Sequence, residues 1–175
     1  TSLWPRRAGS SRLPRRPGTC CEPTSGAPTL QEACQLFDET DHPVDGSGIW
    51  QSVPEITAVY DYVRNIQEGL ELNDKVIVTA LILLERVVKK ADATILHART
   101  WRCSLLIALV IASKVIYDEK IYLADYREQL EPRMSLSRVP QQEAHFLHLL
   151  DYITIINPRQ YAQYYYALLD VAEAL

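Results

Sequence analysis

Residues that make tight turns become scarce after the first third of this sequence. No proline lies between Pro54 and Pro132, and no glycine follows Gly69. An antiparallel β protein needs a turn every few residues, and glycine and proline are among the residues that most often make it. Strands are therefore a poor explanation of this part of the chain. We predict an all-α fold, in which helices are joined by polar loops.

Apolar residues recur at helical spacing where the turn residues are missing. The first stripe follows the i, i+3, i+4, i+7 rule of a helix face. Its members are Ile56, Val59, Tyr60, Val63 and Ile66. Pro54 suits the first turn of this helix, because its missing N–H has no intrahelical acceptor there, and Gly69 suits its end. Asn73 is a good N-cap for a second helix over residues 74–90.

Further helices follow the same reasoning, and two segments are apolar on nearly all sides. The additional helices are predicted over residues 30–37, 99–117, 123–130, 139–152 and after Asn157-Pro158. Residues 76–84 and 105–115 are apolar nearly all round, which is typical of helices in the centre of a bundle. We therefore predict a five-helix bundle around a central apolar helix, with flanking N- and C-terminal helices.

This pattern divides the chain into four parts. They are a basic, proline-rich tail over residues 1–28, a helix and loop over 29–53, the bundle over 54–157 and a C-terminal helix over 158–175. The tail has almost no apolar periodicity, so we expect it to be disordered. We interpret it as a solvated tail or an expression remnant. Contact of its arginines with nucleic acid or acidic lipid is the alternative.

Charge and cysteine content narrow the class of protein. The formal net charge is −4, although the first 21 residues contain arginines and no acid. The rest is therefore strongly acidic, which argues against a nucleic-acid-binding core, because such a core needs a basic face. The cysteines are Cys20, Cys21, Cys34 and Cys103, and no two form a C-x-x-C pair. We expect a reduced, intracellular protein of the cytoplasm or nucleus.

No membrane span is predicted. The longest wholly apolar run, residues 105–112, is eight residues long, whereas a spanning helix needs about 20. Because the chain begins with Thr1 rather than methionine, we expect a fragment or a processed product. Membrane association is expected only if an upstream lipidation signal is missing from it.

Catalytic motifs are absent from the sequence. It contains no phosphate-binding loop, zinc-protease motif or nucleophile elbow. His145 and His148 stand near Glu143, but a structural zinc ion needs four ligands and no further cluster is visible. Asp118 and Glu119 offer a general-base pair, although acids at a helix end are more often exposed to water. We therefore predict no catalytic, metal or cofactor site, and a protein that is not an enzyme.

Two charged residues stand on apolar helix faces. Lys114 lies three residues after Ile111, and Glu143 lies three before Phe146. A buried lysine without a partner is very costly, so Lys114 either reaches water or is paired. One interpretation is a Lys114–Glu143 ion pair that only stabilises the domain. The other is a polar clasp at the rim of an apolar groove, which binds the exposed backbone groups of a partner protein.

The residues around these charges resemble the cyclin box. The resemblance lies in Ile111-Ala112-Ser113-Lys114, in Glu143-Ala144-His145-Phe146-Leu147 and in Leu83-Leu84-Glu85-Arg86-Val87-Val88. Within the family the chain is most similar to cyclin Y and the phosphate-pathway cyclins of fungi. That similarity lies in Leu36-Phe37-Asp38-Glu39, His42-Pro43, Ala112-Ser113-Lys114-Val115, Tyr117-Asp118-Glu119, Asp125-Tyr126 and Tyr161-Ala162-Gln163-Tyr164-Tyr165. It covers about residues 34–175, so the predicted bundle resembles a single cyclin box.

The resemblance implies a regulatory subunit that binds and activates a cyclin-dependent protein kinase as a heterodimer. It implies no small-molecule substrate, cofactor or nucleic acid. In cyclins a lysine and a glutamate at these places bind the kinase, so Lys114 and Glu143 are the candidate clasp. Ile111 and Phe146 are candidates for nearby apolar contacts with the kinase. Asp118 is a candidate contact for an arginine near the kinase activation loop.

A second function stays open beside this one. It is a cyclin-fold scaffold that binds transcription factors or nucleic acid without a kinase, although the acidic composition counts against it. Cell-cycle cyclins also carry a Met-Arg-x-x-Leu patch on the first helix of the box. This chain has Glu55-Ile56-Thr57-Ala58-Val59 at that place, so docking of Arg-x-Leu substrates is not expected.

Overall fold

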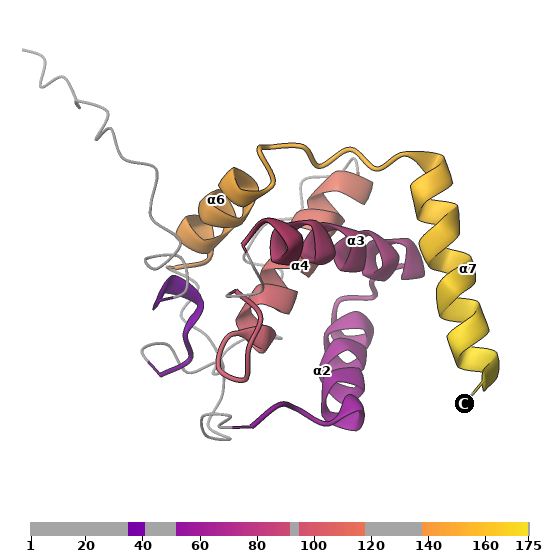
Figure 1. The fold of residues 1–175 in the computed structure, drawn as a ribbon, viewed down its shortest axis with the longest axis horizontal. Helices are drawn as coiled ribbons and strands as arrows, with labels where there is room; N and C mark the ends of the chain where they lie inside the picture. The colour runs from indigo at the N-terminus through magenta and orange to yellow at the C-terminus, as the bar shows by residue number, and fades with distance from the viewer. Residues whose placement is uncertain (1–34, 41–51, 92–94, 118–137, 175) are drawn as a thin grey trace, which may run out of the picture.

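The fold of the described residues is helical (Figure 1). The computed structural model describes residues 35–40, 52–91, 95–117 and 138–174, and no strand occurs within these ranges. The helices are α2 (Ile56–Gly69), α3 (Asp74–Lys90), α4 (Trp101–Ile116), α6 (Val139–Leu149) and α7 (Pro158–Ala174). The all-α prediction is confirmed.

Helix α4 is the buried centre of the domain. Twelve of its sixteen residues are buried, including an unbroken run from Leu106 to Ser113. The contact between α3 and α4 is the most extensive between any two described helices, and α6 also contacts α4. The prediction that an apolar helix over residues 105–115 lies at the centre is confirmed. In the described parts of the chain, no helix has the length and apolar character that crossing a membrane requires.

Local signals set both ends of α3. The side-chain oxygen of Asn73 accepts a hydrogen bond from the N–H of Lys75 at 2.9 Å, as expected of an N-cap. The helix begins at Asp74 and ends at Lys90, which are the predicted limits. Two lysines in its last turn complement the negative end of the helix dipole. The second predicted helix is therefore confirmed at both ends.

Helix α2 packs on the core through its C-terminal end. It begins at Ile56, so Pro54 lies two residues before the helix rather than in its first turn. Among its residues only Ile66 is buried, and Ile56 at the other end is 85% exposed. The apolar period therefore identifies the helix correctly but does not show which of its turns is covered. Gly69 is its last residue, as predicted.

Helix α6 ends three residues before the predicted limit of 152. Asp151 and Tyr152 have φ angles of 52° and 60°, which lie in the left-handed region where an α-helix cannot continue. The N–H of Tyr152 donates to the carbonyl oxygen of Leu147 at 2.9 Å, and that of Asp151 to His148 at 3.0 Å. These two bonds form a Schellman motif, which satisfies the last carbonyl groups of the helix without a glycine.

An extended strap over residues 153–157 connects α6 with α7 (Figure 1). One guanidinium nitrogen of Arg86 donates to the carbonyl oxygens of Ile153 and Ile155, at 3.2 Å each. The other donates to the side-chain oxygen of Gln160 in α7 at 2.6 Å. Helix α3 therefore fixes both the strap and the start of α7. No residue of α7 is buried, although the helix contacts α3.

Some predictions fall outside the described residues. They are the helix over residues 123–130 and the disordered tail over residues 1–28. Of the helix predicted over residues 30–37, the described residues 35–37 are helical.

A core substitution in α4 tests the central position of this helix. Leu106 is completely buried, so Leu106→Ala removes packed atoms and leaves a cavity. We expect the free energy of unfolding to fall by about 2–5 kcal/mol, measured by urea denaturation. Val171→Ala is the control, because Val171 is 57% exposed on α7 and should change stability by less than about 0.5 kcal/mol. Equal effects of the two substitutions would contradict the central position of α4.

Candidate functional site

Lys114 and Glu143 form an ion pair between the last turn of α4 and the first half of α6. The ammonium nitrogen of Lys114 lies 2.6 Å and 2.7 Å from the two carboxylate oxygens of Glu143. The side chain of Lys114 is 39% exposed and that of Glu143 is 18% exposed. The structure therefore pairs the two charges that the sequence singles out, at a place that water and a partner protein can reach.

The apolar residues predicted beside this pair lie beneath it. Ile111 and Phe146 are almost completely buried and belong to the main core. Ile111 precedes Lys114 by three residues on α4, and Phe146 follows Glu143 by three on α6, so each stands about one helical turn from the charged residue of its helix. In this conformation almost none of their surface is exposed. The predicted contact of these two residues with a kinase stays a prediction. Val115, the residue after Lys114, is an exposed apolar residue. Asp118 lies outside the described residues.

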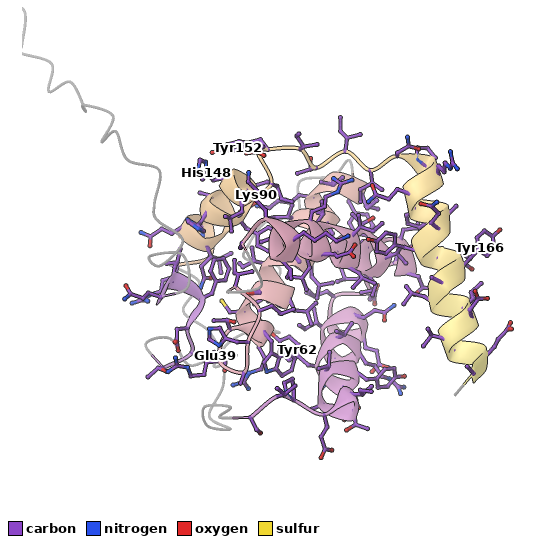
Figure 2. The ribbon with its side chains drawn as sticks, viewed as in Figure 1. Glu39, Tyr62, Lys90, His148, Tyr152 and Tyr166 are labelled. Carbon is purple, nitrogen blue, oxygen red and sulfur yellow. The ribbon has the colours of Figure 1, made fainter. Side chains whose placement is uncertain are left out.

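A second ion pair lies at the other end of α4, and the sequence reasoning missed it. The carboxylate of Glu39 accepts hydrogen bonds from the Nε atom of Arg102 at 3.0 Å and 3.1 Å, and a further one from its NH2 group. Both side chains are buried, with 4% and 0% of the surface of Arg102 and Glu39 exposed. Figure 2 shows Glu39 on the short N-terminal segment, beside the start of α4. Arg102 lies four residues before Leu106, so the helical spacing that singled out Lys114 would also have found Arg102.

The residues around Glu39 fix the N-terminal segment, residues 35–40, between α4 and α6. The Phe37 ring is fully buried and lies 6.3 Å from the ring of His145 and 6.5 Å from that of Phe146, centre to centre. The amide nitrogen of Gln142 donates to the carbonyl oxygen of Leu36 at 2.9 Å. Sequence similarity drew attention to this segment, and the structure shows that it is part of the core.

The pKa values of two groups near the buried Glu39–Arg102 pair are shifted by their surroundings. Partial burial raises the pKa of the Asp38 carboxyl, but hydrogen bonds from Thr40 and the charge of Arg99 outweigh this effect and leave the pKa below its ordinary value of 3.8. Burial, together with the charge of Glu39, raises the pKa of the Cys103 thiol far above its ordinary value. The thiol is therefore protonated and acts as a small apolar group.

Two apolar hollows lie beside α3. The larger, of about 540 Å³, lies among α2, α3 and α4 and is lined by residues such as Val63, Leu84 and Leu105. The smaller, of about 350 Å³, lies beside the end of α4, where Val115 and the side chain of Lys75 contribute to its wall. Their linings are mostly apolar, which suits binding better than catalysis. Within the described ranges, no three His, Cys, Asp or Glu side chains are placed to hold a metal ion.

The comparisons with known proteins point to one family. The sequence model of the family described as Cyclin matches residues 49–154 of this chain. This match spans α2 to α6, includes Lys114 and Glu143, and covers more than half of the chain. No solved structure matches the chain.

The two ion pairs of α4 should differ sharply in their effect on stability. Arg102→Met removes the guanidinium group that holds the buried Glu39 carboxylate, so we expect a loss of about 3–5 kcal/mol in the free energy of unfolding. Lys114→Met breaks a pair that water reaches, so we expect a change of at most about 1 kcal/mol. Urea denaturation of both variants measures the difference. A large loss for Lys114→Met would favour a purely structural role of that pair.

The lowered pKa of Asp38 predicts a pH dependence of stability. The ionised carboxylate interacts with Thr40 and Arg99 only in the folded state, so its contribution is complete above the unfolded pKa and is lost as the pH falls through the folded pKa. We expect the wild type to be more stable than Asp38→Asn at neutral pH. The difference should shrink below about pH 4, when both are compared by thermal melting. A difference that is independent of pH would contradict this assignment.

Proposed function

Since this chain belongs to the cyclin family, whose domain is regulatory rather than catalytic, we propose that it binds and activates a cyclin-dependent protein kinase. The chain is then the regulatory subunit of a heterodimer. The observation that carries this proposal is the Lys114–Glu143 pair, which lies on the surface above the buried residues Ile111 and Phe146.

The pair retains capacity to bind further groups. An ammonium group has three N–H donors, and a carboxylate has about four acceptor positions. Lys114 uses two donors on the oxygens of Glu143. The third donor can bind a backbone carbonyl group of the kinase, and the free lone pairs of Glu143 can accept from its backbone N–H groups. Binding of this kind does not require a particular side chain of the partner.

The exposure of the pair favours a binding role over a stabilising one. An ion pair that water reaches contributes about 0–1 kcal/mol to stability. Contacts of the same groups within a protein interface are stronger, because water is excluded there. We propose that the kinase covers this surface and contacts Val115, the exposed apolar residue beside Lys114.

Activation follows from unequal binding to two kinase states. A kinase is active when a glutamate of its C-helix pairs with the lysine that holds the ATP phosphates. A regulatory subunit favours that state only if it binds it more tightly than the inactive state. In this proposal the Lys114–Glu143 surface contacts the C-helix in its active position. The subunit then needs no contact with the transferred phosphate.

We also propose a subgroup within the family, that of cyclin Y and the phosphate-pathway cyclins. The support is the sequence of the N-terminal segment, together with the burial of its residues Phe37 and Glu39 in the core. In this subgroup Asp118 is expected to meet an arginine near the activation loop of the kinase.

Substitutions of Lys114 and Glu143 separate a binding role of the pair from a structural one. Lys114→Ala and Glu143→Ala should each weaken binding to purified cyclin-dependent kinases by about 30-fold or more, because truncation of a buried interfacial charge costs at least about 2 kcal/mol. Combining Lys114→Glu with Glu143→Lys rebuilds an internal pair, but it places the wrong charges against the kinase backbone. We expect this double variant to fold normally and to bind poorly. Isothermal titration calorimetry and stimulation of peptide phosphorylation measure the two effects.

Lys89→Ala is the matched control, because Lys89 forms an exposed pair with Glu85 on α3. It should bind as the wild type does. Normal kinase binding by the reversed double variant would show that the pair acts only inside the domain. Failure of the wild type to bind any of the purified cyclin-dependent kinases would favour the alternative function, a scaffold that acts without a kinase.

A further inference from the structure

The N-terminal segment, residues 35–40, is fixed to the first turn of α4 by charge. The guanidinium group of Arg102 holds the carboxylate of Glu39, and the N–H of Glu39 donates to the carbonyl oxygen of Arg99 at 2.9 Å. The side chain of Arg99 returns the contact with an ion pair to Asp38 at 3.2 Å. Since the Glu39–Arg102 pair is buried, water does not compete for it, and it holds the segment in one place.

The opposite side of the same segment contacts α6. The Phe37 ring packs on His145 and Phe146, and Gln142 donates to the carbonyl oxygen of Leu36 at 2.9 Å. These three residues of α6 lie at positions i, i+3 and i+4, which form one face of a helix. The segment therefore contacts the face of α6 that is turned toward the start of α4.

Two consecutive residues of α6 reach toward opposite ends of α4. Gln142 donates to the sulfur atom of Cys103 in the first turn of α4 at 2.9 Å. Glu143 accepts from Lys114 in the last turn at 2.6 Å. Cys103 and Lys114 are eleven residues apart, which is about 16 Å along a helix axis. Helix α6 thus crosses α4 between these two contacts. One contact near each end of α4 therefore fixes the rotation of α6 about its own axis.

We propose that Glu39 and Phe37 are positioning residues for the Lys114–Glu143 pair. They set the rotation of α6 on α4, and so they determine whether the carboxylate of Glu143 stands where the kinase needs it. This inference deepens the proposed function and rests on it for the effect on the kinase. The effect on α6 itself does not depend on any partner.

The first arm of the test measures α6 in the full chain without a kinase. Phe37→Leu keeps an apolar side chain but removes the ring contacts, and Glu39→Gln removes the charge. We expect backbone amides of residues 142–147 to exchange hydrogen about tenfold faster in both variants, because local opening becomes easier. Amides in the middle of α3 should be unchanged. Glu39→Gln breaks a buried ion pair and can unfold the domain, and in that case Phe37→Leu decides the result.

Tyr62→Phe is the matched control. The hydroxyl group of Tyr62 donates to the carbonyl oxygen of Arg102 at 3.1 Å, so this variant disturbs the same turn of α4 from the side of α2. It should leave exchange in α6 unchanged. Exchange in α6 that is unaffected by Phe37→Leu, or equally affected by Tyr62→Phe, would overturn the inference.

The second arm measures kinase affinity well below the melting temperature of each variant. Phe37→Leu should weaken binding about tenfold, and the same change should have little further effect in a Glu143→Ala background, because it acts through Glu143. A purely structural role would lower the melting temperature in both backgrounds and leave the affinity unchanged. Equal losses of affinity in both backgrounds would also contradict the inference. If the wild type binds no kinase, the proposed function fails, and hydrogen exchange alone decides the positioning of α6.

Discussion

The structure depends on the burial of α4 on nearly every side. A helix this apolar cannot lie on the surface of a domain, so other elements must cover each of its faces. Helix α3 makes the most extensive contact with α4 among the described helices, α6 also contacts α4, and residues 35–40 pack against its first turn. The polar character that α4 does have is concentrated near its ends, at Arg102 and Lys114. The position of the candidate site at one end follows from that distribution.

The two charges of α4 illustrate different uses of the same kind of interaction. Arg102 is buried with Glu39, and removal of one partner would leave a charge that water cannot solvate. Lys114 is paired with Glu143 at the surface, where water reaches both groups. The first pair suits the assembly of the domain, because it is expensive to break. The second suits reversible recognition, because little stability is lost when its geometry changes.

Features that leave a local pattern in the sequence could be predicted, and features without such a pattern could not. The limits of α3 were correct because Asn73 and the terminal lysines act within one turn of the helix. The end of α6 was missed because Asp151 and Tyr152 adopt left-handed angles that glycine normally signals. The Lys114–Glu143 pair was one of two interpretations of two charges on apolar stripes, each visible within its own helix. The Glu39–Arg102 pair joins residues 63 positions apart, and the helical period contains no information about such a contact.

The way in which Arg86 holds the strap has a consequence for sequence variation. The guanidinium group binds the carbonyl oxygens of Ile153 and Ile155, and every amino acid supplies such an oxygen. The side chains of both residues are exposed and take no part in the contact. The backbone path between α6 and α7 therefore does not depend on which side chains the strap exposes. Natural variation or mutagenesis can change the exposed side chains of the strap and leave its backbone path as it is.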